Sequence, residues 1–404
     1  DLPKDVIQDS TEFSYPSKIK MRSYNPTYHG HPGQIKRAVQ AIGKAQKPLI
    51  YAGGGVILSN AAKELSALSH KYSIPVTTTL MGLGCVPGTH PLFLGMLGMH
   101  GTFQANMAVT HCDLLIAVGA RFDDRVTGKI ESFSPYSKKI HIDIDPTSIS
   151  KNVRVDYPIV GDAKNVLKSL LKILDDEPAR DWATSWAEWF KQIAEWRQIP
   201  PLANRQGNYI LPQDVIRKLY EMTGGEAIIT TEVGQNQMWT AQFYTFNKPR
   251  TLITSGGLGT MGFGFPAALG VQVAFPDKTV IDIAGDGSIQ MNIQELATAV
   301  QYNLPVKVAI LNNRCLGMVR QWQQLFYQQR DSQTLFEVSP DFVKLAEAYG
   351  AVGLRATKPE EVEPVIRQAL SIRKPVFMEF LIDPNECVYP MVPAGAALTE
   401  MLLV

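Results

Sequence analysis

The sequence lacks the features that mark several classes of protein. Its 39 lysine and arginine residues against 38 aspartate and glutamate residues give a net charge of +1, so nothing in the charge attracts nucleic acid or an anionic membrane. The longest apolar runs, such as DLLIAVGA from Asp113, have the length of strands and fall far short of the ~20 residues that span a bilayer. We therefore expect neither a nucleic-acid partner nor a membrane partner.

Cysteine is also scarce. The sequence has four, Cys85, Cys112, Cys315 and Cys387, and no two of them have CxxC spacing. This scatter argues against a zinc site and against a disulfide framework, so we expect a reducing compartment. The cytoplasm is the first choice, and a plastid is the alternative because a transit peptide would precede residue 1.

The composition that is present indicates a folded protein of more than one domain. The chain has 404 residues, of which 45% are hydrophobic and 19% charged, which predicts two or three domains with sizeable cores. It opens with DLPKDVIQDS, without an initiator methionine, a signal peptide or a helix start. We interpret this opening as the final strand of a preceding domain, followed by a linker.

Strand and helix patterns alternate in two blocks. In the first, helical spacing in GQIKRAVQAIGKA precedes the apolar run PLIYAGGG, and DLLIAVGA and KKIHIDID follow as further strands. The second block repeats the rhythm in AIITTEVG, TVIDIAGDG, VKVAILNN and PVFMEFLID, after the connection IPPLANRQGNY. This alternation predicts the α/β class with two doubly wound parallel-sheet domains. The predicted units are a tail and linker over residues 1–30, a central domain over 31–172, a helical linker over 173–207 and a C-terminal domain over 208–404.

The segment GDGSIQMNIQELATAVQYNLPVKVAILNN, residues 285–313, ends two apolar runs in polar residues. Asp286 follows TVIDIA and Asn313 follows VKVAIL, with one amphipathic stretch of 24 residues between Gly-Asp-Gly and Asn-Asn. Ligands of parallel sheets bind beyond the carboxyl ends of the strands, and carboxylate and amide oxygens suit magnesium that holds a phosphate. Gly285 and Gly287 allow a tight turn, and Ser288 at a helix start can donate to phosphate oxygens.

Each half of this motif also has an ordinary interpretation. Gly-Asp-Gly alone is more often a simple turn, and Asn-Asn alone is more often a helix cap. The pair at two strand ends is much more specific. It resembles the fingerprint of the thiamine diphosphate-dependent decarboxylase and carboligase superfamily. The resemblance implies that Asp286, Asn313 and the backbone carbonyl of Cys315 ligate the magnesium that anchors the diphosphate.

Other segments narrow the resemblance to one family. The stretches TEVGQNQMW, SGGLGTMGFGFPAALG, LGMVRQWQQLFY, YPMVPAGAALTEM, TTLMGLG, MLGMHGT and GARFDDRVTGK are similar to the catalytic subunit of acetohydroxyacid synthase, also called acetolactate synthase. The likeness runs along the whole chain. It implies a transferase that decarboxylates pyruvate and condenses the two-carbon unit with pyruvate or 2-ketobutyrate, the first common step of branched-chain amino acid biosynthesis. It also implies that the family's N-terminal pyrimidine-binding domain is missing here.

The resemblance assigns the first block to FAD. The residues alone offer weak signals, because loops use runs such as Gly53–Gly55 freely and an acid at a strand end, such as Asp143, is as often a solvated turn residue. His100 taken alone is more often a structural histidine. The flavin would be structural or inherited, since the net reaction is not a redox reaction. The matching FAD positions are Arg22, Gly54, Thr79, Leu80, Met99, His100, Gly119, Arg121, Asp123, Arg125, Asp143, Ile144 and Asp162.

In the second block, the resemblance places the cofactor's aminopyrimidine against Gly259 and Met261, with Met261 as the apolar wedge that bends the cofactor. Arg125 would bind the carboxylate of the second keto acid, and Trp322 would shape a pocket that prefers 2-ketobutyrate. Without the resemblance, Met261 and Trp322 are core residues. The remaining positions expected to contact thiamine diphosphate are Gln235, Asn236, Asp286, Gly287, Ser288, Asn313, Gly317 and Met318.

One position departs from the family pattern. Asn236 stands where GQHQMW has histidine, and asparagine can donate a hydrogen bond but cannot carry charge. Diphosphate binding should survive with altered strength.

The resemblance further implies a homodimer or homotetramer, a possible regulatory small subunit, and a catalytic glutamate from a neighbouring subunit's N-terminal domain, so that this chain alone would be inactive. Pyruvate oxidase and glyoxylate carboligase are the nearest alternatives. A nicotinamide-binding oxidoreductase or deacetylase would need GxGxxG after the first strand, and GGGVILS lacks its last glycine. The remaining alternative is a non-catalytic cofactor-binding fragment.

Overall fold

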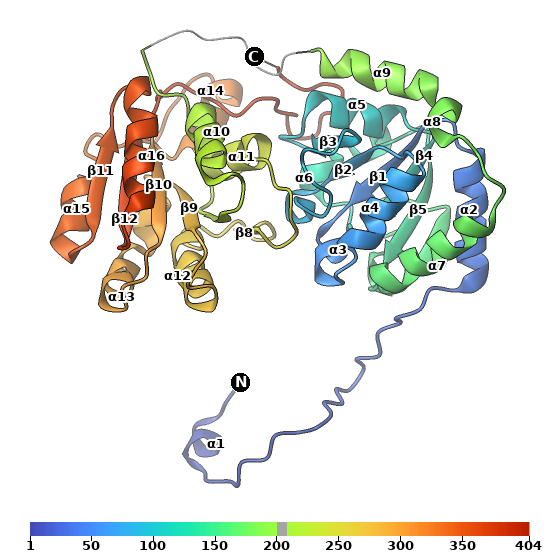
Figure 1. The fold of residues 1–404 in the computed structure, drawn as a ribbon, viewed down its shortest axis with the longest axis horizontal. Helices are drawn as coiled ribbons and strands as arrows, with labels where there is room; N and C mark the ends of the chain where they lie inside the picture. Colours follow the sequence, from blue (N-terminus) through green and yellow to red (C-terminus); the bar gives the residue numbers. More distant parts are fainter. Residues whose placement is uncertain (200–207, 404) are drawn as a thin grey trace.

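A computed structural model describes residues 1–199 and 208–403 of the chain. It contains two α/β domains, each built on a parallel six-stranded sheet with helices packed around it (Figure 1). This confirms the predicted fold class. Most of the connection expected at IPPLANRQGNY lies at residues 200–207, outside the described residues.

The central domain places its first and fourth strands side by side in the middle of the sheet. The strand order is β3-β2-β1-β4-β5-β6, so the chain builds outward from β1 and then returns to add β4 on its other side. A crevice for ligands forms where the order reverses. The strands are β1 (Pro48–Ala52), β2 (Val76–Thr78), β3 (Phe93–Met96), β4 (Leu114–Val118), β5 (Lys138–Asp143) and β6 (Tyr157–Val160).

Amphipathic helices cover this sheet because each buries one apolar stripe. On α7 the stripe is Val166, Leu167, Leu170 and Leu174. Two tryptophans beyond α7 also join the central core: Trp186 donates from Nε1 to the carbonyl of Ala45, and Trp189 to that of Pro48. The helices are α2 (Pro32–Lys44), α3 (Gly54–Leu58), α4 (Ala62–Lys71), α5 (Phe103–His111), α6 (Asp124–Thr127), α7 (Ala163–Asp176), α8 (Trp182–Ser185) and α9 (Ala187–Arg197).

The C-terminal domain has a different strand order, β11-β12-β10-β9-β7-β8, which reverses between β7 and β9. Its strands are β7 (Ile228–Thr231), β8 (Leu252–Thr254), β9 (Val280–Gly285), β10 (Lys307–Asn312), β11 (Val352–Ala356) and β12 (Val376–Leu381). Its helices are α10 (Pro212–Thr223), α11 (Gln235–Phe243), α12 (Gly264–Ala274), α13 (Leu296–Gln301), α14 (Gly317–Phe326), α15 (Phe342–Tyr349) and α16 (Val362–Ser371).

Two local expectations are wrong. The opening DLPKDV forms a short helix, α1 (Lys4–Gln8), rather than a strand; Pro3 occupies its N-cap position and Asp5 complements the helix dipole in its first turn. Ser288, expected at a helix start, precedes a 3₁₀ turn and not an α-helix, and the amphipathic stretch after it is broken. It contains two 3₁₀ turns, η4 (Ile289–Met291) and η5 (Ile293–Glu295), before α13, because Asn292 between them turns to donate to the carbonyl of Gly262.

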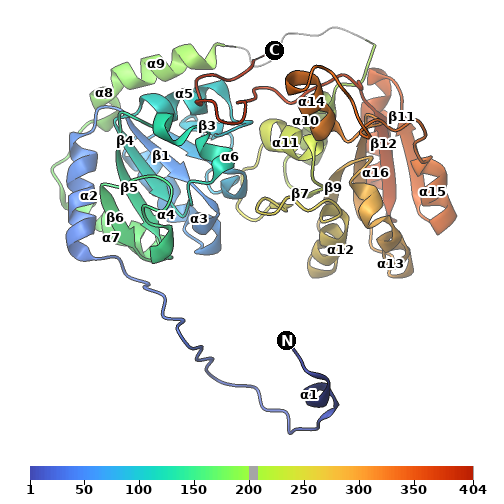
Figure 2. The ribbon, with the colours of Figure 1, turned by 180° about the vertical axis from the view of Figure 1, so that it is seen from behind.

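The C-terminal strap, residues 383–403, returns from the second domain to the first (Figures 1 and 2). The backbone N–H of Val392 donates to the carbonyl of Met99 at 2.8 Å, and that of Lys129 donates to the carbonyl of Ala396 at 2.9 Å. The strap residues Val392, Leu398 and Met401 belong to the core of the central domain. The C-terminal strap therefore completes the core of the central domain.

Candidate active site

The carboxyl ends of three neighbouring strands meet at one edge of the second sheet. β7, β9 and β10 lie side by side, and each is followed by a buried polar residue: Glu232, Asp286 and Asn313 respectively. The strand order reverses between β7 and β9, so this edge is where a parallel sheet binds its ligand.

Three oxygen atoms converge between the ends of β9 and β10. The side-chain oxygen of Asn313 lies 3.3 Å from Asp286 Oδ1 and 3.2 Å from the carbonyl oxygen of Cys315. Asp286 is 1% exposed, and within the described parts of the chain its Oδ2 atom has no hydrogen-bond partner. Burial raises the pKa of Asp286 to about 7. Facing acceptor oxygens of this kind form a ligand set for a hard cation.

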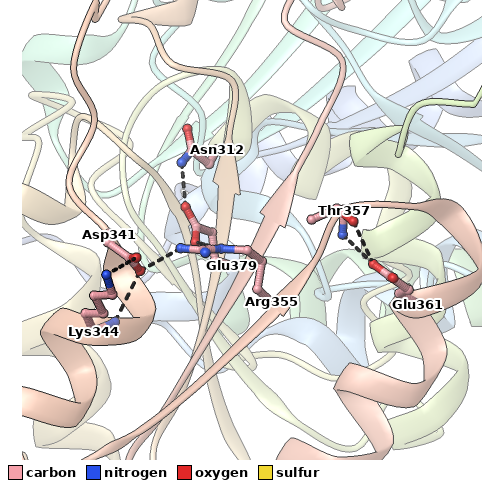
Figure 3. Close-up of polar contacts among 7 residues, drawn as sticks. All are labelled: Asn312, Asp341, Lys344, Arg355, Thr357, Glu361 and Glu379. Carbon is pink, nitrogen blue, oxygen red and sulfur yellow. Dashed lines mark hydrogen bonds and ion pairs between the residues drawn. The ribbon is translucent and has the colours of Figure 1, made fainter.

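A polar network of side chains from β10, β11 and β12 holds the turn after β10 (Figure 3). Asn312 donates from Nδ2 to Glu379 Oε1 at 2.7 Å and accepts the backbone N–H of Arg314 at 3.0 Å. Arg355 donates from Nε to Glu379 Oε2 and from Nη2 to Asp341 Oδ1, both at 2.6 Å. The buried carboxylate of Glu379, paired with Arg355, therefore holds Asn312 and the turn after β10 in place.

The strand register explains this network, which the sequence analysis missed. Glu379 on β12 is paired with Ile310 on β10 and with Arg355 on β11, so their side chains and that of Asn312 share one face of the sheet. One signal was present in the sequence, since Glu379 interrupts the otherwise apolar strand VFMEFL. Its partners come from other strands and could not be chosen from spacing.

The N-terminus of α11 brings Gln235 and Asn236 to the same edge. Asn236 is buried and donates from Nδ2 to the carbonyl of Ile283 on β9 at 2.9 Å. Gln235 accepts from Asn313 Nδ2 at 3.0 Å. A Cβ atom on Gly317 would lie only 2.0 Å from Gln235 Oε1, so glycine is required where α14 begins.

The loop that carries Gly259 and Met261 is anchored by a buried acid that the sequence analysis also missed. Glu232 accepts the backbone N–H of Gly262 at 2.6 Å and that of Phe265 at 3.0 Å. Its neighbour Asp282 accepts from Thr230 Oγ1. Burial is the main cause that raises the pKa of both carboxyls, and the charge of Glu232 further raises that of Asp282.

In the central domain, the turns after β1 and β4 touch backbone to backbone. A Cβ on Gly55 would lie 2.6 Å from Gly119 Cα, and Gly119 itself has φ of +57°. This contact lies at the reversal between β1 and β4. Thr79 Oγ1, at the end of β2, is buried and has no hydrogen-bond partner among the residues that the structure describes. Arg121 and Asp123 follow β4, and Asp143 ends β5.

The other expected FAD positions have varied surroundings. Leu80 begins the 3₁₀ turn η1 (Leu80–Gly82), and a Cβ on Gly54 would meet Met81 in that turn at 3.0 Å. Asp162 caps α7 by accepting the backbone N–H of Asn165. Ile144 is exposed, as is Arg22, which lies in the extended segment before α2.

The two domains touch at His100, one of the expected FAD positions. Gln242 on α11 donates from Nε2 to the carbonyls of His100 at 3.0 Å and of Tyr389 at 3.2 Å. His100 is buried, and its burial lowers its pKa to about 4. Arg125 contacts Met99 beside this junction.

Trp322 on α14 packs edge-on against Phe326 at 5.5 Å between ring centroids. Met318 on the same helix packs against the C-terminal core. Gly287 and Ser288 follow Asp286, and a Cβ on Gly287 would lie 2.8 Å from Leu316.

Across residues 1–199 and 208–403, no group of three or more His, Cys, Asp or Glu side chains could hold a metal ion. The converging oxygens near Asp286 differ in kind, because an amide and a backbone carbonyl supply two of them. Over the same residues, none of the helices has both the length and the apolar character needed to cross a bilayer.

Comparison with known proteins identifies the family. A model of the thiamine pyrophosphate enzyme central domain matches residues 35–170, and one of the C-terminal TPP binding domain of these enzymes matches residues 232–380. The whole chain is 51% identical over 409 residues to the acetolactate synthase large subunit of Buchnera aphidicola subsp. Schizaphis graminum, and covers 71% of that protein. It belongs to the acetolactate synthase family.

Other members are similarly close across bacteria and archaea. The acetolactate synthase isozyme 3 large subunit of Escherichia coli (strain K12) is 50% identical over 409 residues, which is 100% of this chain and 71% of that protein. The probable acetolactate synthase large subunit of Methanocaldococcus jannaschii is 50% identical over 412 residues, which is 100% of this chain and 69% of that protein. The family resemblance found in the sequence is confirmed, and the chain is a thiamine pyrophosphate-dependent enzyme of the acetolactate synthase type.

Proposed function

We propose that the edge of the second sheet binds thiamine diphosphate through a magnesium ion held by Asp286, Asn313 and the carbonyl of Cys315. The observation that carries this proposal is the convergence of these three oxygens, two of them within 3.3 Å of the Asn313 oxygen. The unpartnered Oδ2 of Asp286, at a site from which water is largely excluded, supports a cation at this point. When bound, thiamine diphosphate supplies an electron sink for decarboxylation of a 2-keto acid.

The protein's own groups would position this cofactor. Met261 lies in a loop whose turn is held by Glu232, and this support favours its role as the wedge against the aminopyrimidine, together with Gly259. Asn236 is committed to the carbonyl of Ile283, which supports a weaker contribution to diphosphate binding than a histidine would make. Gly287, Ser288, Gly317 and Met318 complete the proposed contacts.

A calorimetric titration tests the metal-dependent part of this proposal. Thiamine diphosphate titrated into the chain with MgCl₂ should bind with a measurable heat, and the same titration in EDTA should give at least ~10-fold weaker binding. Equal affinity in the two buffers would contradict the magnesium assignment while leaving the family membership intact.

We propose that the central domain holds FAD in the crevice at the β1 and β4 turns. The close crossing of Gly55 and Gly119 and the unpartnered Thr79 hydroxyl support a nucleotide there. The proposed contacts also include Gly54, Leu80, Met99, His100, Arg121, Asp123, Arg125, Asp143, Ile144, Asp162 and Arg22. An absorbance spectrum of the chain after incubation with FAD and gel filtration tests this proposal.

The substrates we propose are pyruvate and a second 2-keto acid, with the product entering branched-chain amino acid biosynthesis. Arg125 and Trp322 lie on different domains, and the contacts between α11, His100 and the strap bring those domains together. This junction supports a shared substrate site, with Arg125 binding a carboxylate and Trp322 shaping the pocket.

The assembly and the domain limits are also proposals. The relatives are named large subunits, which supports a small-subunit partner. From the family resemblance, we also propose a homodimer or homotetramer of this chain. The four cysteines are free thiols, which supports a reducing compartment such as the cytoplasm. We propose that the central domain spans residues 31–172 and that the C-terminal domain begins at residue 208.

A further inference from the structure

The orientation of the Asn313 amide cannot be decided from its nearest neighbours alone. Its oxygen faces two other acceptors, Asp286 Oδ1 and the Cys315 carbonyl, while its Nδ2 faces Gln235 Oε1. Exchanging the oxygen and nitrogen of Asn313 would let the nitrogen donate to Asp286 and Cys315. Such an exchange would turn a donor toward the proposed cation, so a further constraint must fix the amide.

That constraint begins at the backbone of Val388. Its N–H donates to Gln321 Oε1 at 2.8 Å, and its carbonyl accepts from Gln321 Nε2 at 3.0 Å. A backbone N–H can only donate and a carbonyl can only accept, so both ends of the Gln321 amide are assigned. Gln321 is fully buried, which prevents water from replacing either partner.

The assignment passes from Gln321 to Asn313 through one intermediate amide. Gln235 donates from Nε2 to Gln321 Oε1 at 2.9 Å and to the carbonyl of Glu386 at 3.2 Å. Both partners are acceptors there, so Gln235 Oε1 must face Asn313. Asn313 must then donate from Nδ2, which turns its oxygen toward Asp286 and Cys315.

We propose that Gln321 is a positioning residue for the metal site: through Gln235, it holds the Asn313 oxygen toward the cation without contacting the cation itself. The inference rests on the proposed magnesium site and extends it to a residue on α14 and to the strap. The absence of a side chain at Gly317 leaves the room that this relay occupies, since a Cβ there would lie 2.0 Å from Gln235 Oε1 and 2.8 Å from Asn313 Nδ2.

The test is the affinity for magnesium in the Gln321→Met variant. Methionine has a similar length but cannot make the hydrogen bonds of the amide. Gln235 then keeps only its longer bond to the carbonyl of Glu386, so its orientation, and with it that of Asn313, is held less firmly. MgCl₂ titrated calorimetrically into the chain saturated with thiamine diphosphate should bind about 10–100-fold more weakly, as is usual when a group behind a metal ligand is lost. The matched control is Gln324→Met on the same helix, where the partly exposed amide donates to Asp331 at 3.3 Å, away from the relay, and magnesium affinity should not change.

A double-variant cycle separates orientation from general structural damage. In Asn313→Asp, the two carboxylate oxygens are equivalent, and the locked Gln235 oxygen faces one of them. Adding Gln321→Met there leaves only the longer Glu386 bond to hold Gln235, which can give it up to turn and donate to the carboxylate, so magnesium affinity should be unchanged or improved. An equal loss in the two backgrounds, or no loss in the first, would overturn the proposal.

Two controls keep the outcome decisive. If Gln321→Met does not fold, Gln321→Asn provides the same test, because its amide is one methylene too short to reach both Val388 and Gln235. If Asp286→Asn leaves magnesium binding unchanged, the magnesium site itself is wrong, which is a different result from failure of the relay alone.

Discussion

At the residue scale, the proposed metal site depends on a single carboxylate. Asp286 supplies the only formal negative charge among the three converging oxygens, since the other two belong to an amide and a peptide group. Asn at this position keeps the shape and one oxygen but loses the charge. Asp286→Asn should therefore weaken magnesium-dependent thiamine diphosphate binding by at least ~100-fold. A hard cation binds a charged oxygen ligand better than a neutral one, and contacts to ionised groups are about twice as strong as those to neutral groups.

The measurement is calorimetry of the folded variant, with circular dichroism as the check on folding. Asp277→Asn is the matched control, because Asp277 is exposed in the connection before β9. Unchanged affinity in Asp286→Asn would show that the cation, if bound, is held elsewhere.

A second residue-scale prediction concerns pH and the buried carboxyl of Asp282. Burial and the neighbouring Glu232 raise its pKa well above the usual value, so the folded chain binds a proton that the unfolded chain has already released. Stability from this group is present at low pH and is lost as pH rises from the unfolded pKa, near ~4, toward the folded one. Asp282→Asn carries no charge to bury, so it should be more stable than the wild type at pH 8.

Urea denaturation at pH 4, 6 and 8 measures this difference. The stabilisation of Asp282→Asn should shrink steadily toward pH 4, since the wild-type carboxyl is then protonated. A difference independent of pH would mean that Asp282 has the same pKa in the folded chain as in the unfolded chain.

At the element scale, α14 begins at a glycine for a steric reason. Alanine normally favours a helix over glycine by about 1 kcal/mol. At Gly317 the added Cβ would meet Gln235 Oε1 at 2.0 Å, and overpacking of this kind costs about 1–3 kcal/mol. Gly317→Ala should therefore lower the free energy of unfolding, against its helix propensity.

Gly270→Ala on α12 provides the opposite case. A Cβ there meets nothing within 4 Å and the position is exposed, so this variant should gain up to about 1 kcal/mol. Chemical denaturation of both variants checks the pair, and a gain at Gly317 would argue against the close approach of α11 and α14.

Elements differ in how well their sequences predict them. β9 and β10 are buried along nearly their whole length, so mainly apolar runs mark them although Asp282 interrupts β9, and their polar ends marked the candidate site. β3 has the four residues FLGM, with a glycine inside, and no pattern of that length distinguishes a strand from a loop. Glu379, Arg355 and Gln321 escaped notice because their partners lie on other elements, 14 or more residues away, and only the fold brings them together.

At the scale of the whole molecule, the two domains share their cores. Leu398 on the strap is 2% exposed within the central core, although it lies more than 200 residues beyond that domain's last strand. Leu398→Ala should destabilise the central domain by about 2–5 kcal/mol, as large-to-small changes in cores do. Hydrogen exchange of the β4 and β5 amides measures this loss directly.

Leu402→Ala is the control, since that side chain is 36% exposed and should change exchange little. If Leu398→Ala accelerates exchange only in the C-terminal domain, the strap does not stabilise the central core.

The strap also constrains the order in which this protein can fold. A chain leaving the ribosome exposes residues 48–160, which hold all six strands of the central sheet, before any strand of the second sheet. Val392, Leu398 and Met401 emerge after both sheets, so the central domain is made before the C-terminal domain but has its core filled only after it. These contacts span most of the sequence, and such long loop closures slow folding. During synthesis the central domain must wait with part of its apolar surface uncovered, and its interval of exposure to aggregation is set by the time needed to translate the second domain.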